Sequence, residues 1–320
     1  MAATALTEAL ERQGVLVLDG AMATELERHG ADLSGGLWSA RLLLEQPELI
    51  AQVHRDYFEA GADVAITASY QASVPGFAGV GLSRREAEQL LQRSVRLAMA
   101  ARDEFWAANE TSDRQRPLVA TSVGPYGAVL ADGSEYRGHY RVSHGDLVSF
   151  HRNRLAVLVD AGVEVLACET LPSLEEAEAL VEALGAWPDV AAWVSFSAQD
   201  GQRVSDGTAA QECAGWLHEQ EQVVAIGVNC SAVEHITPLL GELASATDKP
   251  LVTYPNSGEI WDATRQRWLG APTAAGFETL AAQWYAAGAR LIGGCCRTGP
   301  SDIRAISKAL LPDRPATGRS

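Results

Sequence analysis

Short apolar runs of strand length recur along the chain, and segments with helical periodicity lie between them. The runs are apolar throughout rather than alternating, which is typical of parallel strands buried on both faces. They span residues 15–18, 64–69, 118–123, 163–168, 192–197, 224–229, 251–254 and 290–294. Eight strand–helix alternations predict an α/β fold, a single-domain (β/α)8 or TIM barrel. The barrel is expected over residues 1–311, with a flexible C-terminal tail at 312–320.

A repeated junction supports this alternation of helices and strands. At three places an Ala-Gly pair ends a helical segment and an apolar run follows, with the glycines at Gly61, Gly162 and Gly288. Glycine takes the left-handed conformation that ends a helix with little strain. Ser173 and Glu176 have the spacing of a capping box that opens a helix. The alternative fold is a doubly wound open sheet, but the turn after the first run lacks the glycine pattern typical of it.

Composition and charge exclude several classes of function and location for this protein. The chain has 320 residues, and 25 Lys+Arg against 41 Asp+Glu give a net charge of −16. Such a surface repels phosphate backbones, so no nucleic-acid partner is expected. Residues 1–14 do not read as a signal peptide, and no stretch reaches the ~18 apolar residues of a membrane span. Five cysteines do not make a disulfide scaffold, so we expect a cytoplasmic protein with reduced thiols.

Three of the cysteines follow predicted strands. Cys230 follows the sixth strand, and the adjacent Cys295 and Cys296 follow the eighth. In a barrel these strand ends are close enough to share one metal ion, and three thiolates leave a fourth position open, as in catalytic zinc sites. Buried packing and a vicinal disulfide that acts as a redox switch are the alternatives. Cys168 and Cys213 are interpreted as buried hydrophobic residues.

Acidic and aromatic residues also lie at the predicted strand ends. Asp19 follows the first strand and Glu169 follows the fourth. Either each carboxylate caps the helix that follows it, or the two carboxylates together bind an ammonium group. Aromatic residues at these ends either pack or face a cationic ligand such as a sulfonium. Trp38 and Tyr70 are two of them.

Seven segments of the chain resemble the homocysteine S-methyltransferase family, over residues 15–310. They are Asp19-Gly-Ala-Met-Ala-Thr-Glu-Leu, Ile66-Thr-Ala-Ser-Tyr-Gln-Ala, Ser122-Val-Gly-Pro-Tyr-Gly-Ala, Cys168-Glu-Thr-Leu-Pro, Gly227-Val-Asn-Cys, Tyr254-Pro-Asn-Ser-Gly-Glu and Gly293-Gly-Cys-Cys-Arg-Thr. The branch that the chain resembles most uses S-methylmethionine. Betaine-using relatives have a second glycine where Ala21 stands and carry a C-terminal extension that this chain lacks. The missing extension favours a monomer over a homodimer.

The resemblance implies a role for each group of site residues. It implies one zinc ion per chain, a homocysteine site and a methyl-donor site. The zinc ligands are Cys230, Cys295 and Cys296; the homocysteine-binding residues are Asp19, Glu169 and Asn229; the donor-binding residues are Trp38 and Tyr70.

The expected reaction is zinc-dependent methyl transfer from a sulfonium donor to the thiol of L-homocysteine, giving methionine. S-methylmethionine and S-adenosylmethionine are the candidate donors. Zinc coordination would deprotonate the thiol, and the leaving group is a neutral thioether, so no acid–base residue is required. Methylation of a selenocysteine-type or other thiol acceptor and a redox-regulated vicinal-cysteine protein are the alternative functions.

Overall fold

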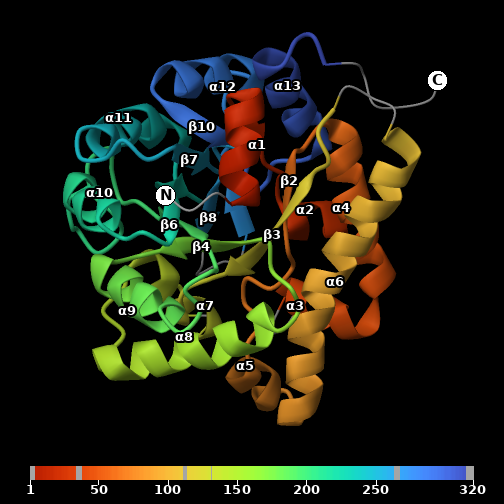
Figure 1. Cartoon of the computed structure of the whole chain (residues 1–320), viewed down its shortest axis with the longest axis vertical. Helices are drawn as coiled ribbons and strands as arrows, with labels where there is room; N and C mark the ends of the chain where they lie inside the picture. Colours follow the sequence, from red (N-terminus) through yellow and green to blue (C-terminus); the bar gives the residue numbers. More distant parts are fainter. Residues whose placement is uncertain (1–3, 34–37, 111–113, 131, 263–266, 315–320) are drawn as a thin grey trace.

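Eight parallel strands curve into a nearly closed barrel in the computed structural model, which describes residues 4–33, 38–110, 114–130, 132–262 and 267–314. The strand order is β1-β10-β7-β6-β5-β4-β3-β2, and a parallel bridge between Leu18 and Val64 links β1 to β2. The predicted (β/α)8 barrel is confirmed (Figure 1). Its strands are β1 (Leu16–Val17), β2 (Val64–Ile66), β3 (Leu118–Val123), β4 (Val165–Leu171), β5 (Ala192–Phe196), β6 (Val223–Asn229), β7 (Leu251–Tyr254) and β10 (Ala289–Ile292).

Long helices surround this sheet and cover its outer face (Figure 1). They are α4 (Pro47–Ala60), α6 (Arg84–Asn109), α8 (His144–Val159), α9 (Leu174–Leu184), α10 (Ala210–His218), α11 (Val233–Ala244), α12 (Phe277–Ala286) and α13 (Pro300–Leu310). The three predicted junction glycines have φ values of +111° at Gly61, +91° at Gly162 and +105° at Gly288. Each therefore adopts the left-handed conformation for which glycine is suited.

Shorter elements lie in the connections. They are α1 (Ala5–Gln13), α2 (Met22–Arg28), α3 (Trp38–Glu45), α5 (Val74–Gly79), α7 (Tyr126–Leu130), the 3-10 helix η1 (Ser134–Tyr136), and an antiparallel hairpin of β8 (Ile260–Asp262) and β9 (Arg267–Leu269). The pattern of apolar positions did not predict the hairpin, because its strands are three residues long and do not join the barrel. We call the end of the barrel where the carboxyl ends of the strands lie the mouth, and the opposite end the floor.

The helix α1 closes the floor. Leu6 and Ala9 of this helix are buried in one cluster with inward-facing strand residues such as Leu16, Val64 and Trp193. Thr4 caps the helix through a hydrogen bond from the Thr7 backbone N–H, and Gly14 ends it with a φ of +80°. The barrel is therefore filled by side chains and closed at the floor, so we expect a ligand site at the mouth.

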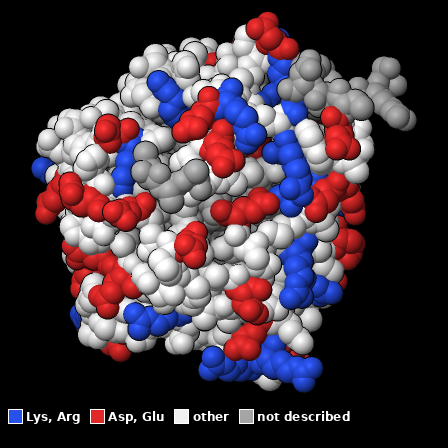
Figure 2. All heavy atoms as spheres, viewed as in Figure 1, with Lys and Arg blue, Asp and Glu red and all other residues white. Residues whose placement is uncertain are grey.

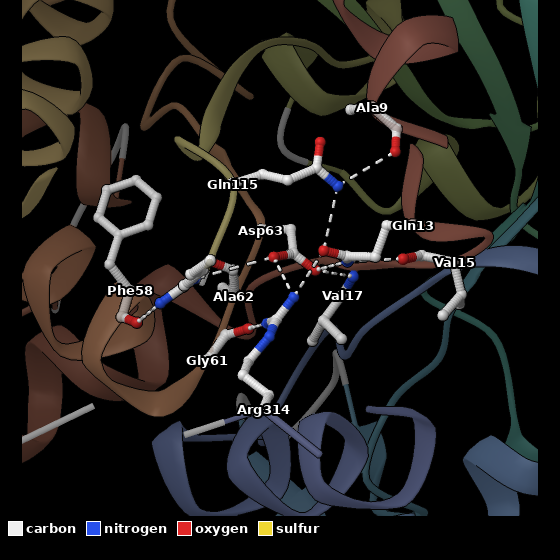
Figure 3. Close-up of polar contacts among 11 residues, drawn as sticks. Ala9, Gln13, Val15, Val17, Phe58, Gly61, Ala62, Asp63, Gln115 and Arg314 are labelled. Atoms are coloured by element: carbon white, nitrogen blue, oxygen red, sulfur yellow. Dashed lines mark hydrogen bonds and ion pairs between the residues drawn. The ribbon is translucent and has the colours of Figure 1, made fainter. Parts of the chain in front are cut away.

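A polar cluster joins the end of α1 to the last described residue at the floor (Figure 3). The carboxylate of Asp63 accepts hydrogen bonds from Gln13, from the Val17 backbone and from Arg314 at 2.7 Å. Arg314 also donates to the Gly61 carbonyl and to Gln13. Arg314 belongs to the segment for which a flexible tail is predicted, and residues 315–320 lie outside the described part of the chain.

The surface shown in Figure 2 has acidic and basic side chains interspersed. The net charge of −16 is therefore not gathered into one patch on this face. Among the described residues, the helices are all too short or too polar to span a bilayer.

Candidate active site at the barrel mouth

The three cysteines that follow β6 and β10 meet at the mouth. Their sulfur atoms all lie within 4.8 Å of one another, and the Cys230 and Cys296 sulfurs are 3.5 Å apart. Cys230 is buried, whereas Cys295 and Cys296 are partly exposed. Three convergent thiols of this kind fit a soft cation such as Zn²⁺ or Cu(I) better than Mg²⁺. The sequence-based prediction that these residues converge agrees with this arrangement.

The backbone that presents these thiols is constrained. Cys230 has a φ of +49°, a left-handed conformation that a non-glycine residue adopts only at a cost. A Cβ on Gly293 would lie 2.6 Å from the Leu18 Cβ, and one on Gly294 would lie 2.4 Å from the Thr298 hydroxyl. The two glycines therefore let the segment before Cys295 pass close to β1 and to the loop that leads into α13. Packing of the protein itself explains this Gly-Gly pair.

The thiols share hydrogen bonds. The Cys295 and Cys296 thiols lower the pKa of Cys230 well below its ordinary value, because both donate to its thiolate. The pKa values of Cys295 and Cys296 are raised by the same interaction. The hydroxyl of Tyr136, in η1, lies 3.3 Å from the Cys230 sulfur. The three thiols therefore titrate as one coupled group, in which hydrogen bonds from Cys295 and Cys296 favour the thiolate at Cys230.

Asp19 is buried directly after β1 and does not cap α2. One carboxylate oxygen accepts a hydrogen bond from the Ile66 backbone N–H at 2.8 Å, whereas the N-cap of α2 is Ala21. Burial raises the pKa of Asp19 well above its ordinary value, the charge of Glu169 raises it further, and the Ile66 bond opposes both. Ala21 has a φ of −66°, so its methyl group, where betaine-using relatives have glycine, brings no backbone strain.

Glu169 lies on β4 and is also buried. Ser122 on β3 donates a short hydrogen bond to its carboxylate, and Tyr254 on β7 contributes a second one. Burial raises the pKa of Glu169 to about 7 against these hydrogen bonds, and the charge of Cys230 raises it further. The cap of α9 is Ser173, so the capping alternative for Glu169 is wrong.

Asn229, at the end of β6, is held within the protein. Its side-chain oxygen accepts hydrogen bonds from the Thr170 backbone N–H at 2.8 Å and from the Ser195 hydroxyl at 2.9 Å. Its side-chain nitrogen donates to the Thr170 hydroxyl at 2.7 Å. Thr170 has a φ of +60°, so Asn229 fixes a strained residue next to Glu169.

Tyr70 lies near the thiols, and hydrogen bonds to its backbone hold it in place. The backbone carbonyls of Ser69 and Tyr70 accept hydrogen bonds from the buried Arg154 of α8. A Cβ on Gly124 would lie 2.6 Å from the Tyr70 ring, so this glycine makes room for it. Burial raises the pKa of Tyr70, and the charge of Cys230 adds to the effect. Trp38 begins α3, and its side chain lies outside the described part of the structure.

Sequence reasoning missed three residues that this site uses. Ser122 contacts Glu169, Thr170 contacts Asn229, and Tyr136 contacts Cys230. Ser122 and Thr170 lie within segments that resemble the family, so their positions at strand ends were a usable signal. Tyr136 lies in the long loop after β3, where spacing gives no indication of which side chain turns inward.

The fold and the site define an α/β-barrel protein with a thiol triad and two buried carboxylates at the mouth. The chain belongs to the homocysteine S-methyltransferase family, whose sequence model matches residues 16–310. It is 54% identical over 299 residues to homocysteine S-methyltransferase YbgG of Bacillus subtilis, which covers 93% of this chain and 95% of that one. The predicted family and enzyme class are confirmed.

Solved structures of a relative support the same family. The homocysteine methyltransferase MmuM of Escherichia coli, in its metallated form, is 50% identical and superposes with a TM-score of 0.84 over 94% of this chain and 98% of that chain. Its oxidized form superposes with a TM-score of 0.85 at the same identity and coverage.

Proposed function

We propose that this enzyme transfers a methyl group from a sulfonium donor, S-methylmethionine or S-adenosylmethionine, to the thiol of L-homocysteine in a zinc-dependent reaction. The observation that carries the proposal is the convergence of Cys230, Cys295 and Cys296 within 4.8 Å of one another at the barrel mouth. The metallated form of the Escherichia coli relative supports the binding of a metal ion.

The thiol triad fits a zinc ion by the chemistry of its donors. Three thiolates supply soft ligands and leave one tetrahedral position for a substrate sulfur. Bound there, zinc would act as a Lewis acid that keeps the homocysteine sulfur deprotonated at neutral pH. Cys230, Cys295 and Cys296 are the residues that would hold it.

The buried carboxylates of Asp19 and Glu169 fit the ammonium group of homocysteine. Both carry raised pKa values because burial disfavours their charge, and an ammonium ion placed between them would relieve that cost. Asn229 contributes by holding Thr170 next to Glu169, and one of its two amide hydrogens has no partner among the described residues. We assign these residues to homocysteine binding and orientation.

The donor is assigned to Trp38 and Tyr70, the aromatic residues predicted for it, of which Tyr70 lies near Cys230. Aromatic faces attract a sulfonium through their quadrupole. In the reaction the homocysteine sulfur forms a bond to the methyl carbon while the donor's bond to that carbon breaks, and the electron pair remains on the donor sulfur. The leaving thioether is neutral and needs no proton, so the protein's main task is to position the two substrates and exclude water.

The experiment is a methyl-transfer assay on the purified enzyme, with metal analysis and without added cobalamin or folate. We expect methionine to form from homocysteine and a sulfonium alone, with one zinc per chain under reducing conditions. Competition between the two sulfoniums, expressed as kcat/KM, identifies the donor. A metal-free chain that contains a Cys295–Cys296 disulfide and does not methylate homocysteine would support the redox function. A higher kcat/KM for a selenol acceptor would support the other alternative.

A further inference from the structure

Glu135 in η1 is a half-buried mouth carboxylate with one buried oxygen, Oε2, that has no hydrogen-bond partner among the described residues. Within that part of the chain no ion pair to Glu135 forms, and the guanidinium of the neighbouring Arg137 is directed to the Asp132 carbonyl at 3.3 Å. Burying a carboxylate without a partner costs free energy, so such a group calls for a reason.

The segment that carries Glu135 is fixed against the mouth. The Ser197 hydroxyl at the end of β5 donates to the Glu135 carbonyl at 3.2 Å, and the next residue, Tyr136, contacts the Cys230 sulfur. A Cβ on Gly127 would lie 2.5 Å from the Glu135 nitrogen, so this glycine allows α7 and η1 to pack closely. The carboxylate is therefore held in a set place rather than carried by a free loop.

The charge of this carboxylate interacts with the thiols and with the predicted donor residue. Burial raises the pKa of Glu135, and the charges of Cys230 and Asp132 raise it further, while Arg137 opposes them. The charge of Glu135 in turn raises the pKa of Tyr70. The charge of Glu135 thus acts on both Cys230 and Tyr70.

The residues assigned to the donor supply no full negative charge for it. A sulfonium amino acid carries a sulfonium and an ammonium group against a single carboxylate, so it brings net positive charge to the mouth, and an aromatic ring does not neutralise that charge. Asp19 and Glu169 are proposed for the ammonium group of homocysteine. Glu135 is a further, half-buried carboxylate whose charge acts on both Cys230 and Tyr70.

We propose that Glu135 recognises the positive charge of the sulfonium donor and so distinguishes the donor from the neutral thioether product. The inference rests on the proposed function, because it assumes that a sulfonium binds beside Tyr70. Transfer of the methyl group removes the positive charge from the donor sulfur. The product therefore loses its attraction to Glu135 at the moment it must leave.

This role has a kinetic signature. Glu135 stabilises the charged donor in the ground state, whereas the positive charge on the donor sulfur is already reduced in the transition state. Its contribution is therefore to donor affinity and not to the rate of the bound complex. Replacing it raises KM for the donor and leaves kcat unchanged or higher.

The experiment compares the Glu135→Gln variant with the wild type in the full-length, zinc-loaded enzyme. Equilibrium binding of S-methylmethionine and of methionine, which lacks the charge, is measured for each protein. We expect the variant to bind S-methylmethionine about tenfold more weakly and methionine with unchanged affinity. KM for homocysteine stays the same. The Tm of the free variant is equal to or higher than that of the wild type, because a half-buried charge has been removed.

Two further variants make the comparison specific. Asp132→Asn removes an exposed charge from the same loop, and an amide oxygen can still accept the Ser134 N–H bond that Asp132 makes at 2.9 Å. It should leave both affinities unchanged. Glu135→Asp keeps the charge on a shorter side chain and should retain part of the preference for S-methylmethionine over methionine.

Several results would overturn the role of Glu135. They are an equal loss of affinity for S-methylmethionine and methionine, an effect confined to homocysteine, or a Glu135→Asp variant with no more preference for the charged ligand than Glu135→Gln. A lower Tm with an unchanged affinity ratio would show a purely structural role. If the wild type discriminates between the two ligands but never methylates homocysteine, the proposed function fails while the assignment of Glu135 stands.

Discussion

The two ends of the barrel treat buried carboxylates in opposite ways. At the floor, Asp63 forms an ion pair with Arg314 at 2.7 Å (Figure 3). Its carboxylate also lies 3.8 Å from the Arg114 guanidinium. At the mouth, the structure describes no ion pair to Asp19, Glu169 or Glu135 among residues 4–33, 38–110, 114–130, 132–262 and 267–314. The protein therefore supplies a counter-charge for Asp63 at its floor, whereas we propose that ligands supply those of Asp19, Glu169 and Glu135 at its mouth.

Backbone strain is likewise found at the mouth of the barrel. Thr170, Cys230 and Arg297 have positive φ without being glycines, and all three follow or end strands at the mouth. The two other such residues, His139 and Arg141, are in the loop after β3, which also belongs to the mouth. Backbone strain and buried charge without a partner both cost free energy. Stability and chemistry are thus separated along the axis of one barrel, and three sets of variants test the separation.

Loss of a thiol should produce the largest effect. Cys230→Ala, Cys295→Ala and Cys296→Ala each remove one of three metal ligands, so each should lose bound zinc and reduce kcat/KM by about a thousandfold or more. Metal analysis and the methyl-transfer assay measure both changes. Cys213→Ala, in α10 and away from the mouth, is the matched control and should keep metal and activity. If the variant with all three cysteines replaced by alanine still methylates homocysteine, the reaction does not depend on the metal.

Glu169→Gln should have an intermediate effect: it should weaken the binding of homocysteine and raise the stability of the free enzyme above about pH 7. Without this carboxylate, homocysteine should bind about a hundredfold more weakly. The wild-type pKa of about 7 lies above the ordinary value of 4.5, so the folded state holds this proton more tightly than the unfolded state. Wild-type stability should therefore fall as the pH rises from 4.5 to about 7 and stay lower above it.

The variant lacks this charge, so at pH 8 its Tm should be higher than that of the wild type. The corresponding gain in the free energy of unfolding is up to about 3 kcal/mol. Near pH 5 the difference should largely vanish. Calorimetry at the two pH values measures it, with the exposed Glu221→Gln as the control. A variant that is less stable than the wild type at pH 8 would show that Glu169 is compensated after all.

Arg314→Ala should leave catalysis almost unchanged and lower stability. It breaks a buried ion pair and leaves Asp63 with only the more distant Arg114, at a cost of about 3 kcal/mol. KM for both substrates should match the wild type, because the mouth is untouched. Thermal unfolding and steady-state kinetics check the two halves of this expectation. Arg304→Ala, on the exposed side of α13, is the control. A change in KM would show that floor and mouth are coupled.

Local patterns predicted the barrel and the thiol site because each depends on residues close in sequence. Apolar runs define the strands, Gly61 ends a helix by its own conformational freedom, and Cys295 and Cys296 are adjacent. The topology of a barrel then brings Cys230 to them without further information. The same logic placed Asp19 and Glu169 at the mouth.

Contacts between distant segments were not predictable in this way. Glu176 has the spacing of a capping box, and its backbone N–H does bond Ser173. Its carboxylate instead turns inward to the Tyr126 backbone, the Tyr140 hydroxyl and His151. Glu135 likewise lies in a polar loop, where no periodicity indicates burial. The positions of the Glu176 and Glu135 side chains depend on how loops pack against distant parts of the chain, which a local sequence pattern does not show.

The contact between the end of α1 and the last described residue has a practical consequence. Gln13, the last residue of α1, and Arg314 are joined by a hydrogen bond of 3.0 Å on the side away from the mouth (Figure 3). A circularly permuted enzyme would need a linker from Arg314 that runs the length of α1, with its new ends placed in a surface loop. A solid support coupled to the floor would leave the mouth open to substrates, which suits the protein to immobilisation.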